Sequence, residues 1–161
     1  MKLLHPGDAF PSLELSLPSG ETPALPAAFA GDHAVVLVFR GSWCPYCNAQ
    51  LRAFQRAQDR LAELGARIVA LSVDDEATTC ELIAKHGLSY PVGHSADAVA
   101  LRDALGAFID GEPPYLQSTG FVLDPRGRVV VGVYSSGAIG RLVPDDVAGV
   151  IRYLRDQTAA A

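Results

Sequence analysis

The segment Arg40-Gly41-Ser42-Trp43-Cys44-Pro45-Tyr46-Cys47 carries two cysteines in C-x-x-C spacing at the boundary between two predicted elements. The uninterrupted apolar run Ala34–Phe39 before it predicts a buried strand, and apolar residues that recur every three to four positions after it predict a long helix. Proline suits the first position of a helix because it has no backbone N–H to leave unpaired. The sequence therefore predicts Pro45 as the first helical residue, Cys44 as the N-cap and Cys47 in the first turn.

A cysteine at this position is expected to be reactive. The N–H groups of the first helical turn lack partners within the helix, and together with the helix dipole they favour a thiolate over a thiol. A free cysteine has a pKa of about 8.5, which helix N-termini and C-x-x-C motifs lower to roughly 3.5–7.5. Because the thiolate is the nucleophile, the segment predicts a redox-active dithiol.

The cysteine pair could also be inert core residues or half of a zinc site. A structural zinc site takes four ligands. The third cysteine, Cys80, is distant in the sequence, and no ligand spacing is seen among the histidines His5, His33, His86 and His94. We therefore expect no metal and no other cofactor.

Length and composition are typical of one soluble domain over residues 1–161. Apolar residues make up 49% and charged residues 19% of the chain. The net charge of −5, with no long basic run, argues against nucleic acid or an anionic membrane as a partner. No stretch approaches the length of a membrane span, and the first residues lack the apolar core of a signal peptide. We expect a cytoplasmic protein.

The predicted elements alternate as in an α/β protein. A second apolar strand over 67–73 follows the helix over about 45–64, and this strand–helix–strand unit should have parallel strands. An N-terminal extension rich in proline and glycine precedes the unit. The other predicted elements are a half-exposed strand at 13–17, a short extended segment at 90–93, helices at 76–86, 98–105 and from 144 onward, a loop at 106–118 and an antiparallel hairpin at 121–133.

This arrangement resembles the thioredoxin-like fold, and Trp43-Cys44-Pro45-Tyr46-Cys47 is similar to the active-site signature of thioredoxins and glutaredoxins. Other segments resemble the peroxiredoxins of the AhpC/TSA (redoxin) family, and these segments are Pro6–Pro11, Leu71–Asp74, Ala84–Pro91 and Phe121–Gly127. The resemblance covers nearly the whole chain. It implies a central mixed sheet flanked by helices.

The resemblance also implies a thiol-dependent peroxidase. A cysteine thiolate would attack a hydroperoxide and become a sulfenic acid, and the neighbouring thiol would condense with it to a Cys44–Cys47 disulfide. Thioredoxin, glutaredoxin or a low-molecular-weight thiol would then reduce the disulfide. A homodimer is compatible with this family. Two alternatives stay open: a thioredoxin-like protein disulfide reductase with Cys44 as nucleophile, and a non-catalytic binding module or redox switch on the same scaffold.

The family pattern P-x-x-x-T/S-x-x-C assigns roles to several positions. Its last residue, the peroxidatic cysteine, matches Cys47, which places Cys44 at the Thr/Ser position and Arg40 at the proline. The arginine that the family carries before the hairpin strand would fall near Ser118, so Arg40 and Arg141 are the candidates to replace it. The thioredoxin register instead makes Cys44 the nucleophile and Cys47 the resolving cysteine. For peroxide, we favour Cys47 as the attacking residue.

Candidate roles can be given to four further residues. Trp43 could shield the dithiol and dock a reductant, or pack in the core. Arg40 could stabilise the thiolate, or be a solvated charge at a strand end. Thr119, which matches the cis-proline position of thioredoxins, could hydrogen-bond the sulfur, although this rests on fold analogy alone. Cys80 lies 33 residues after Cys47, a spacing similar to that of the resolving cysteine in some peroxiredoxins of the bacterioferritin-comigratory (Q) type. Because Cys44 already neighbours Cys47, we expect Cys80 to be a small buried residue.

Overall fold

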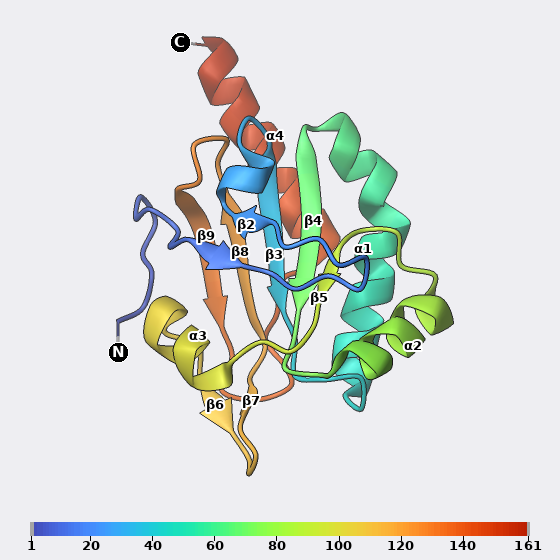
Figure 1. The fold of residues 1–161 in the computed structure, drawn as a ribbon. Helices are drawn as coiled ribbons and strands as arrows, with labels where there is room; N and C mark the ends of the chain where they lie inside the picture. The colour runs from blue at the N-terminus through green and yellow to red at the C-terminus, as the bar shows by residue number, and fades with distance from the viewer. Residues whose placement is uncertain (1, 161) are drawn as a thin grey trace.

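A five-stranded mixed sheet forms the centre of the computed structural model, which describes residues 2–160. In chain order its strands are β3 His33–Val38, β4 Ala66–Leu71, β5 Val92–Gly93, β8 Thr119–Leu123 and β9 Val129–Tyr134. Across the sheet they lie in the order β5-β4-β3-β8-β9 (Figure 1). β3 is parallel to β4, and β8 is antiparallel to β3 and β9. The predicted parallel unit, the mixed sheet and the thioredoxin-like fold class are confirmed.

Helices and short strand pairs surround this sheet. The helices are α1 Pro45–Glu63, α2 Glu76–His86, α3 Ala98–Leu105, α4 Pro144–Ala160 and the short 3-10 helix η1 Ala27–Phe29. The two-residue strands are β1 Leu13–Glu14 paired with β2 Ala24–Leu25, and β6 Ile109–Asp110 paired with β7 Tyr115–Leu116. None of the helices within residues 2–160 is long and apolar enough to cross a lipid bilayer.

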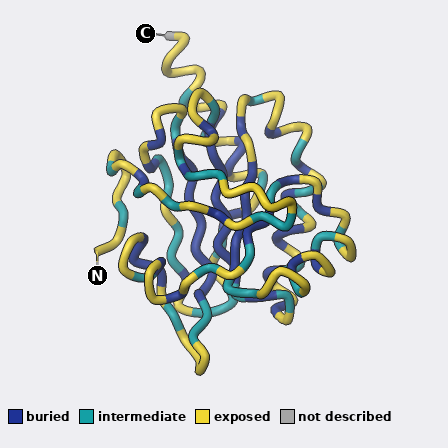
Figure 2. The backbone as a smooth tube through the Cα atoms, viewed as in Figure 1, coloured by how far each residue is buried: buried dark blue, intermediate teal, exposed yellow. Residues whose placement is uncertain are grey.

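Both faces of the sheet are covered, so the core has two parts. α1, α2 and α4 pack on one face, whereas α3 and the N-terminal segment with β1, β2 and η1 pack on the other (Figure 1). Alternate residues of β3 serve the two sides, with Val35 in the first cluster and Val36 in the second. Burial on both faces explains the uninterrupted apolar run of this strand. In Figure 2 the central strands are the dark, buried part of the backbone.

The structure corrects three details of the predicted elements. The expected strand at 13–17 is limited to β1, since Ser16 makes only an isolated bridge with His94. The segment 106–118, expected to be a loop, contains the β6–β7 hairpin, which is too short to show a periodic pattern. β8 begins at Thr119, two residues before the predicted hairpin strand. The β6–β7 hairpin matters for the site because the hydroxyl of Tyr115 in β7 accepts a hydrogen bond from Arg40, which lies shortly before α1.

Candidate active site

The two cysteines lie at the N-terminus of α1, as predicted. Cys44 is the N-cap, with extended backbone dihedrals, and Pro45 is the first helical residue. The Sγ atom of Cys44 accepts a hydrogen bond from the backbone N–H of Cys47 at 3.3 Å. This is the usual N-cap interaction, made here by a sulfur in place of an oxygen. Because of the C-x-x-C spacing, one of the N–H groups that lack a partner within the helix donates directly to the Cys44 sulfur.

Polar contacts fix the loop that leads into the helix. The backbone N–H of Ser42 donates to Asp74 Oδ2 at 2.8 Å, and the carbonyl oxygen of Ser42 accepts from Asn48 Nδ2 at 3.0 Å. A Cβ atom at Gly41 would lie 2.8 Å from Trp43 Cδ1, so a larger residue there would displace the indole ring. The loop is thus tied to the residues after β4 on one side and to α1 on the other.

Cys47 is fully buried and its sulfur has two N–H donors. The Sγ atom accepts from the backbone N–H of Arg40 at 3.4 Å and from Arg141 Nη2 at 3.3 Å. Arg141 is itself held, because its Nη1 donates to Gln50 Oε1 at 2.7 Å and its Nε donates to the carbonyl oxygen of Ala138 at 3.0 Å. Arg141 is far from Cys47 in the sequence, but these contacts hold its guanidinium against the Cys47 sulfur.

Cys44 is equally buried, and a different arginine serves it. Arg40 Nη1 lies 3.7 Å from Cys44 Sγ, within hydrogen-bond range for sulfur. The same guanidinium donates from Nε to Gln117 Oε1 at 2.9 Å and from Nη2 to the hydroxyl of Tyr115 at 3.2 Å. It also lies over the Trp43 ring, 4.7 Å from the ring centroid. Each sulfur therefore receives one backbone amide and one guanidinium.

The environment separates the acidities of the two thiols. Burial opposes a charge on Cys44, but hydrogen bonds from the thiol and backbone N–H of Cys47 oppose this effect. With Arg40 and the charge of Arg141 added, they hold the pKa of Cys44 below its ordinary value. For Cys47, burial raises the pKa, and so does donating its own proton to Cys44; these effects outweigh the two donors at its sulfur. Of the two thiols, Cys44 is therefore the more acidic and Cys47 the less acidic.

The structure settles several expectations about single residues. Arg40 and Arg141 both reach a sulfur, so Arg40 is not merely a solvated charge at a strand end. Trp43 is 56% exposed and packs edge-on against Tyr115, so core packing was the wrong interpretation for it. The Thr119 hydroxyl donates to the carbonyl oxygen of Gln117 at 3.0 Å and not to a sulfur.

Cys80 also differs from its expected environment. It is exposed on α2, so the prediction of a small buried residue was wrong. The buried positions of that helix are Thr79 and Leu82, which leaves Cys80 on the solvent side. Across residues 2–160, moreover, His, Cys, Asp and Glu side chains do not gather in threes at any point where they could hold a metal ion.

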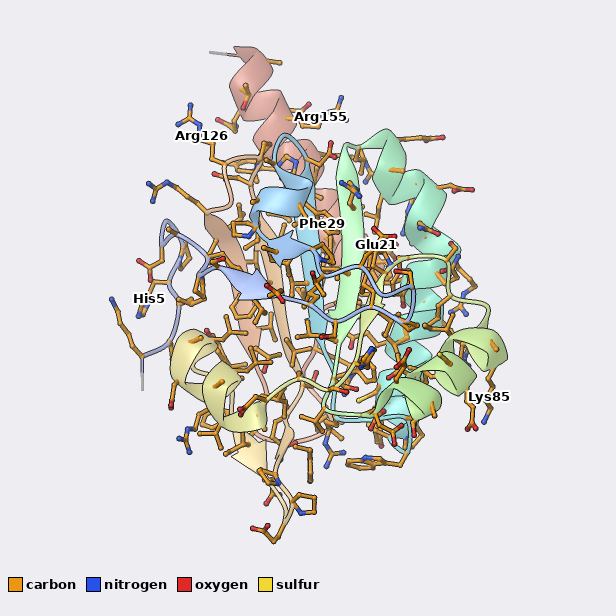
Figure 3. All side chains as sticks on the ribbon, viewed as in Figure 1. His5, Glu21, Phe29, Lys85, Arg126 and Arg155 are labelled. Carbon is orange, nitrogen blue, oxygen red and sulfur yellow. The ribbon has the colours of Figure 1, made fainter. Side chains whose placement is uncertain are left out.

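Sequence reasoning missed three residues of the site. Gln50 follows Cys47 by one helical turn, so its helix position was a usable signal. Gln117 and Tyr115 come from the β6–β7 region, where no sequence motif or periodicity indicates a functional residue. The remaining arginines of the chain include Arg155, which belongs to α4, and Arg126. Figure 3 shows both at the opposite end of the molecule from the β6–β7 hairpin.

Comparison with known proteins gives a consistent assignment. The model of the AhpC/TSA family matches residues 6–131. A peroxiredoxin of Methanothermobacter thermautotrophicus is 29% identical over 155 residues, which span 92% of this chain and 71% of that protein. The thiol-disulfide oxidoreductase ResA of Oceanobacillus iheyensis is 30% identical over 96 residues, which span 58% of this chain and 50% of that protein.

A solved structure shows the same fold. The peroxiredoxin 6 of Arenicola marina superposes with a TM-score of 0.80 at 18% sequence identity, over 94% of this chain and 74% of that one. The similarity in fold thus extends beyond the segment around the cysteines to nearly the whole chain. Together with the family match over residues 6–131, it shows that the chain belongs to the AhpC/TSA family.

Proposed function

We propose that this protein is a thiol-dependent peroxidase that reduces hydroperoxides with its dithiol. Membership of the AhpC/TSA family and relatives named peroxiredoxin support this function. The observation that supports it most directly is the pairing of each buried sulfur with one amide N–H and one guanidinium. These donors stabilise a thiolate before reaction and an oxyanion during it.

The first step is attack of the Cys44 thiolate on one peroxide oxygen. The S–O bond forms as the O–O bond breaks, and Cys44 becomes a sulfenic acid. The other oxygen leaves with the bonding electron pair and takes up a proton, which gives water or an alcohol. Arg40 lies against the attacking sulfur and can stabilise negative charge on the departing oxygen.

The second step forms a disulfide between the two cysteines. Cys47 loses its proton and attacks the sulfur of the Cys44 sulfenic acid, and hydroxide leaves and is protonated to water. The amide of Arg40 and the guanidinium of Arg141 lie at Cys47 Sγ and would stabilise its transient thiolate. An external thiol, such as thioredoxin, glutaredoxin or a low-molecular-weight thiol, then returns the disulfide to the dithiol.

The order of the two cysteines is part of the proposal. The family pattern favours attack by Cys47, whereas the directions of the two pKa shifts favour Cys44. We choose Cys44 because the more acidic of two thiols supplies the larger fraction of thiolate at a given pH. Single-cysteine variants distinguish the two orders.

The test is stopped-flow fluorescence of Trp43, the single tryptophan of the chain, after mixing reduced protein with hydrogen peroxide. Cys44→Ser should abolish the fast phase, Cys47→Ser should keep it but stop at a sulfenic acid detectable by mass spectrometry, and Cys80→Ser should change nothing. Loss of the fast phase in Cys47→Ser alone would reverse the order but keep the function. A rate no higher than that of a free thiol at equal thiolate fraction would refute peroxidase activity.

A second candidate is reduction of protein disulfides, with Cys44 again as nucleophile. Two observations favour it: Trp43 is exposed beside Cys44, and the chain is similar over part of its length to a protein named thiol-disulfide oxidoreductase. Insulin reduction tests it. Turnover that disappears in Cys44→Ser, together with slow reaction with peroxide, would favour this activity over peroxide reduction.

A further inference from the structure

Each of the three guanidinium nitrogens of Arg40 has a hydrogen-bond partner. Arg40 follows β3 in the sequence, and these nitrogens contact Gln117, Cys44 and Tyr115. Arginine has a long flexible side chain, so its contact with a sulfur depends on what restrains its other nitrogens. Gln117 and Tyr115 supply these restraints from a segment 75 to 77 residues further along the chain.

The segment that carries these two residues is well anchored. Tyr115 belongs to β7, which pairs with β6, and the backbone N–H of Gln117 donates to the carbonyl oxygen of Phe108 at 2.8 Å. Gln117 is only 4% exposed, so its side chain has little freedom to leave Arg40. The Tyr115 ring packs edge-on against Trp43 with 5.1 Å between ring centroids. Gly111 makes room for this ring, because a Cβ atom there would lie 2.7 Å from Tyr115 Cε1.

We propose that Gln117 and Tyr115 are positioning residues that hold the Arg40 guanidinium against the sulfur of Cys44. The proposal rests on the proposed function in one respect, namely that Cys44 reacts as a thiolate. Arg40 is then the link between the β6–β7 hairpin and the chemistry. Neither positioning residue hydrogen-bonds a sulfur, so their effect on Cys44 must pass through Arg40.

The arrangement predicts an effect on one cysteine only. The charged and titratable groups at Cys44 are Cys47, Arg40 and Arg141. The cation at Cys47 Sγ is Arg141, and it is held by Gln50 and the Ala138 carbonyl, independently of the hairpin. In proteins that retain only one of the two cysteines, loosening Arg40 should therefore raise the pKa of Cys44 and leave that of Cys47 in place.

The experiment measures each thiol pKa from the ultraviolet absorbance of the thiolate in proteins that retain a single cysteine. With Cys44 as that cysteine, Gln117→Met and Tyr115→Phe should each raise its pKa, by about one unit when combined, since an opposite charge within reach shifts a pKa by about 1–3 units. In an Arg40→Met background the same two substitutions should produce no further shift. With Cys47 as the single cysteine, neither substitution should change the pKa.

Two results would overturn the proposal: no shift at Cys44, or an equal shift with and without Arg40. Tyr115→Phe removes only a hydroxyl and keeps the ring, so it decides the question if Gln117→Met does not fold. Because these titrations use no peroxide, their outcome is independent of peroxidase activity. A protein that fails to reduce peroxide could still show a Cys44 pKa that depends on Arg40. A protein that reduces peroxide could equally show a Cys44 pKa that does not.

Discussion

Replacing Arg40 by methionine should move the pH dependence of peroxide reduction and lower its maximum. Arg40 Nη1 lies 3.7 Å from Cys44 Sγ. At that distance the attraction of two unit charges is about 1 kcal/mol in water and about 4 kcal/mol at the effective dielectric of a protein surface. One pKa unit corresponds to about 1.4 kcal/mol, so the pKa of Cys44 should rise by roughly 1 to 3 units.

The second effect of Arg40→Met concerns the transition state. Removal of one donor from an oxyanion site slows a reaction by about 10²–10³. The assay is the rate of oxidation by hydrogen peroxide as a function of pH, followed by Trp43 fluorescence. A higher midpoint reports the lost thiolate stabilisation, and a lower plateau at high pH reports the lost stabilisation of the leaving oxygen.

The control for this prediction is Arg102→Met. Arg102 pairs with Asp103 on α3, and its removal should change neither midpoint nor plateau. An Arg40→Met protein that keeps the wild-type midpoint would refute the reasoning, because it would show that the guanidinium does not stabilise the Cys44 thiolate. A shifted midpoint with an unchanged plateau would limit Arg40 to the ground state.

Four other substitutions have effects that follow from the structure. Arg141→Met should raise the pKa of Cys47 and slow disulfide formation, seen as sulfenic acid that accumulates and is trapped by dimedone. Phe54→Ala removes a fully buried ring and should lower the free energy of unfolding in urea by about 3–5 kcal/mol. Tyr153→Ala, at a position that is 62% exposed, should change it by less than about 0.5 kcal/mol. Burial lowers the pKa of His33 below its ordinary 6.5, so the unfolded chain binds a proton first and stability falls as the pH drops below that value. His33→Gln should flatten this part of the stability profile, and an unchanged slope would contradict it.

The sequence was most informative where structure depends on near neighbours. β3 and α1 were predicted almost to the residue because an apolar run and a helical period are local patterns. The N-cap role of Cys44 was predictable for the same reason, since Pro45 follows it directly. The β6–β7 hairpin was missed because two-residue strands have no period to detect.

The partners of the sulfurs depended on contacts that no local pattern encodes. Arg141 is 94 positions from Cys47, so the sequence could name it as a candidate but could not place it. Nothing in the local sequence indicates the role of Gln117, because a glutamine in a loop has many uses. Cys80 was misjudged because α2 is only weakly amphipathic, and its buried face had to be read from the packing of Thr79 and Leu82.

Because both sulfurs are completely buried, the entry of peroxide into the site is a separate step from its reaction with the thiolate. Neither Cys44 nor Cys47 has exposed surface, while Trp43 stands outside them, largely in solvent. A peroxide must therefore wait for a local opening before it meets the thiolate. At low peroxide concentration the oxidation rate is proportional to concentration, but at high concentration it should level off at the frequency of opening. A protein reductant is much larger than a peroxide. The site therefore has to stay open for as long as the thiol–disulfide exchange with that reductant lasts.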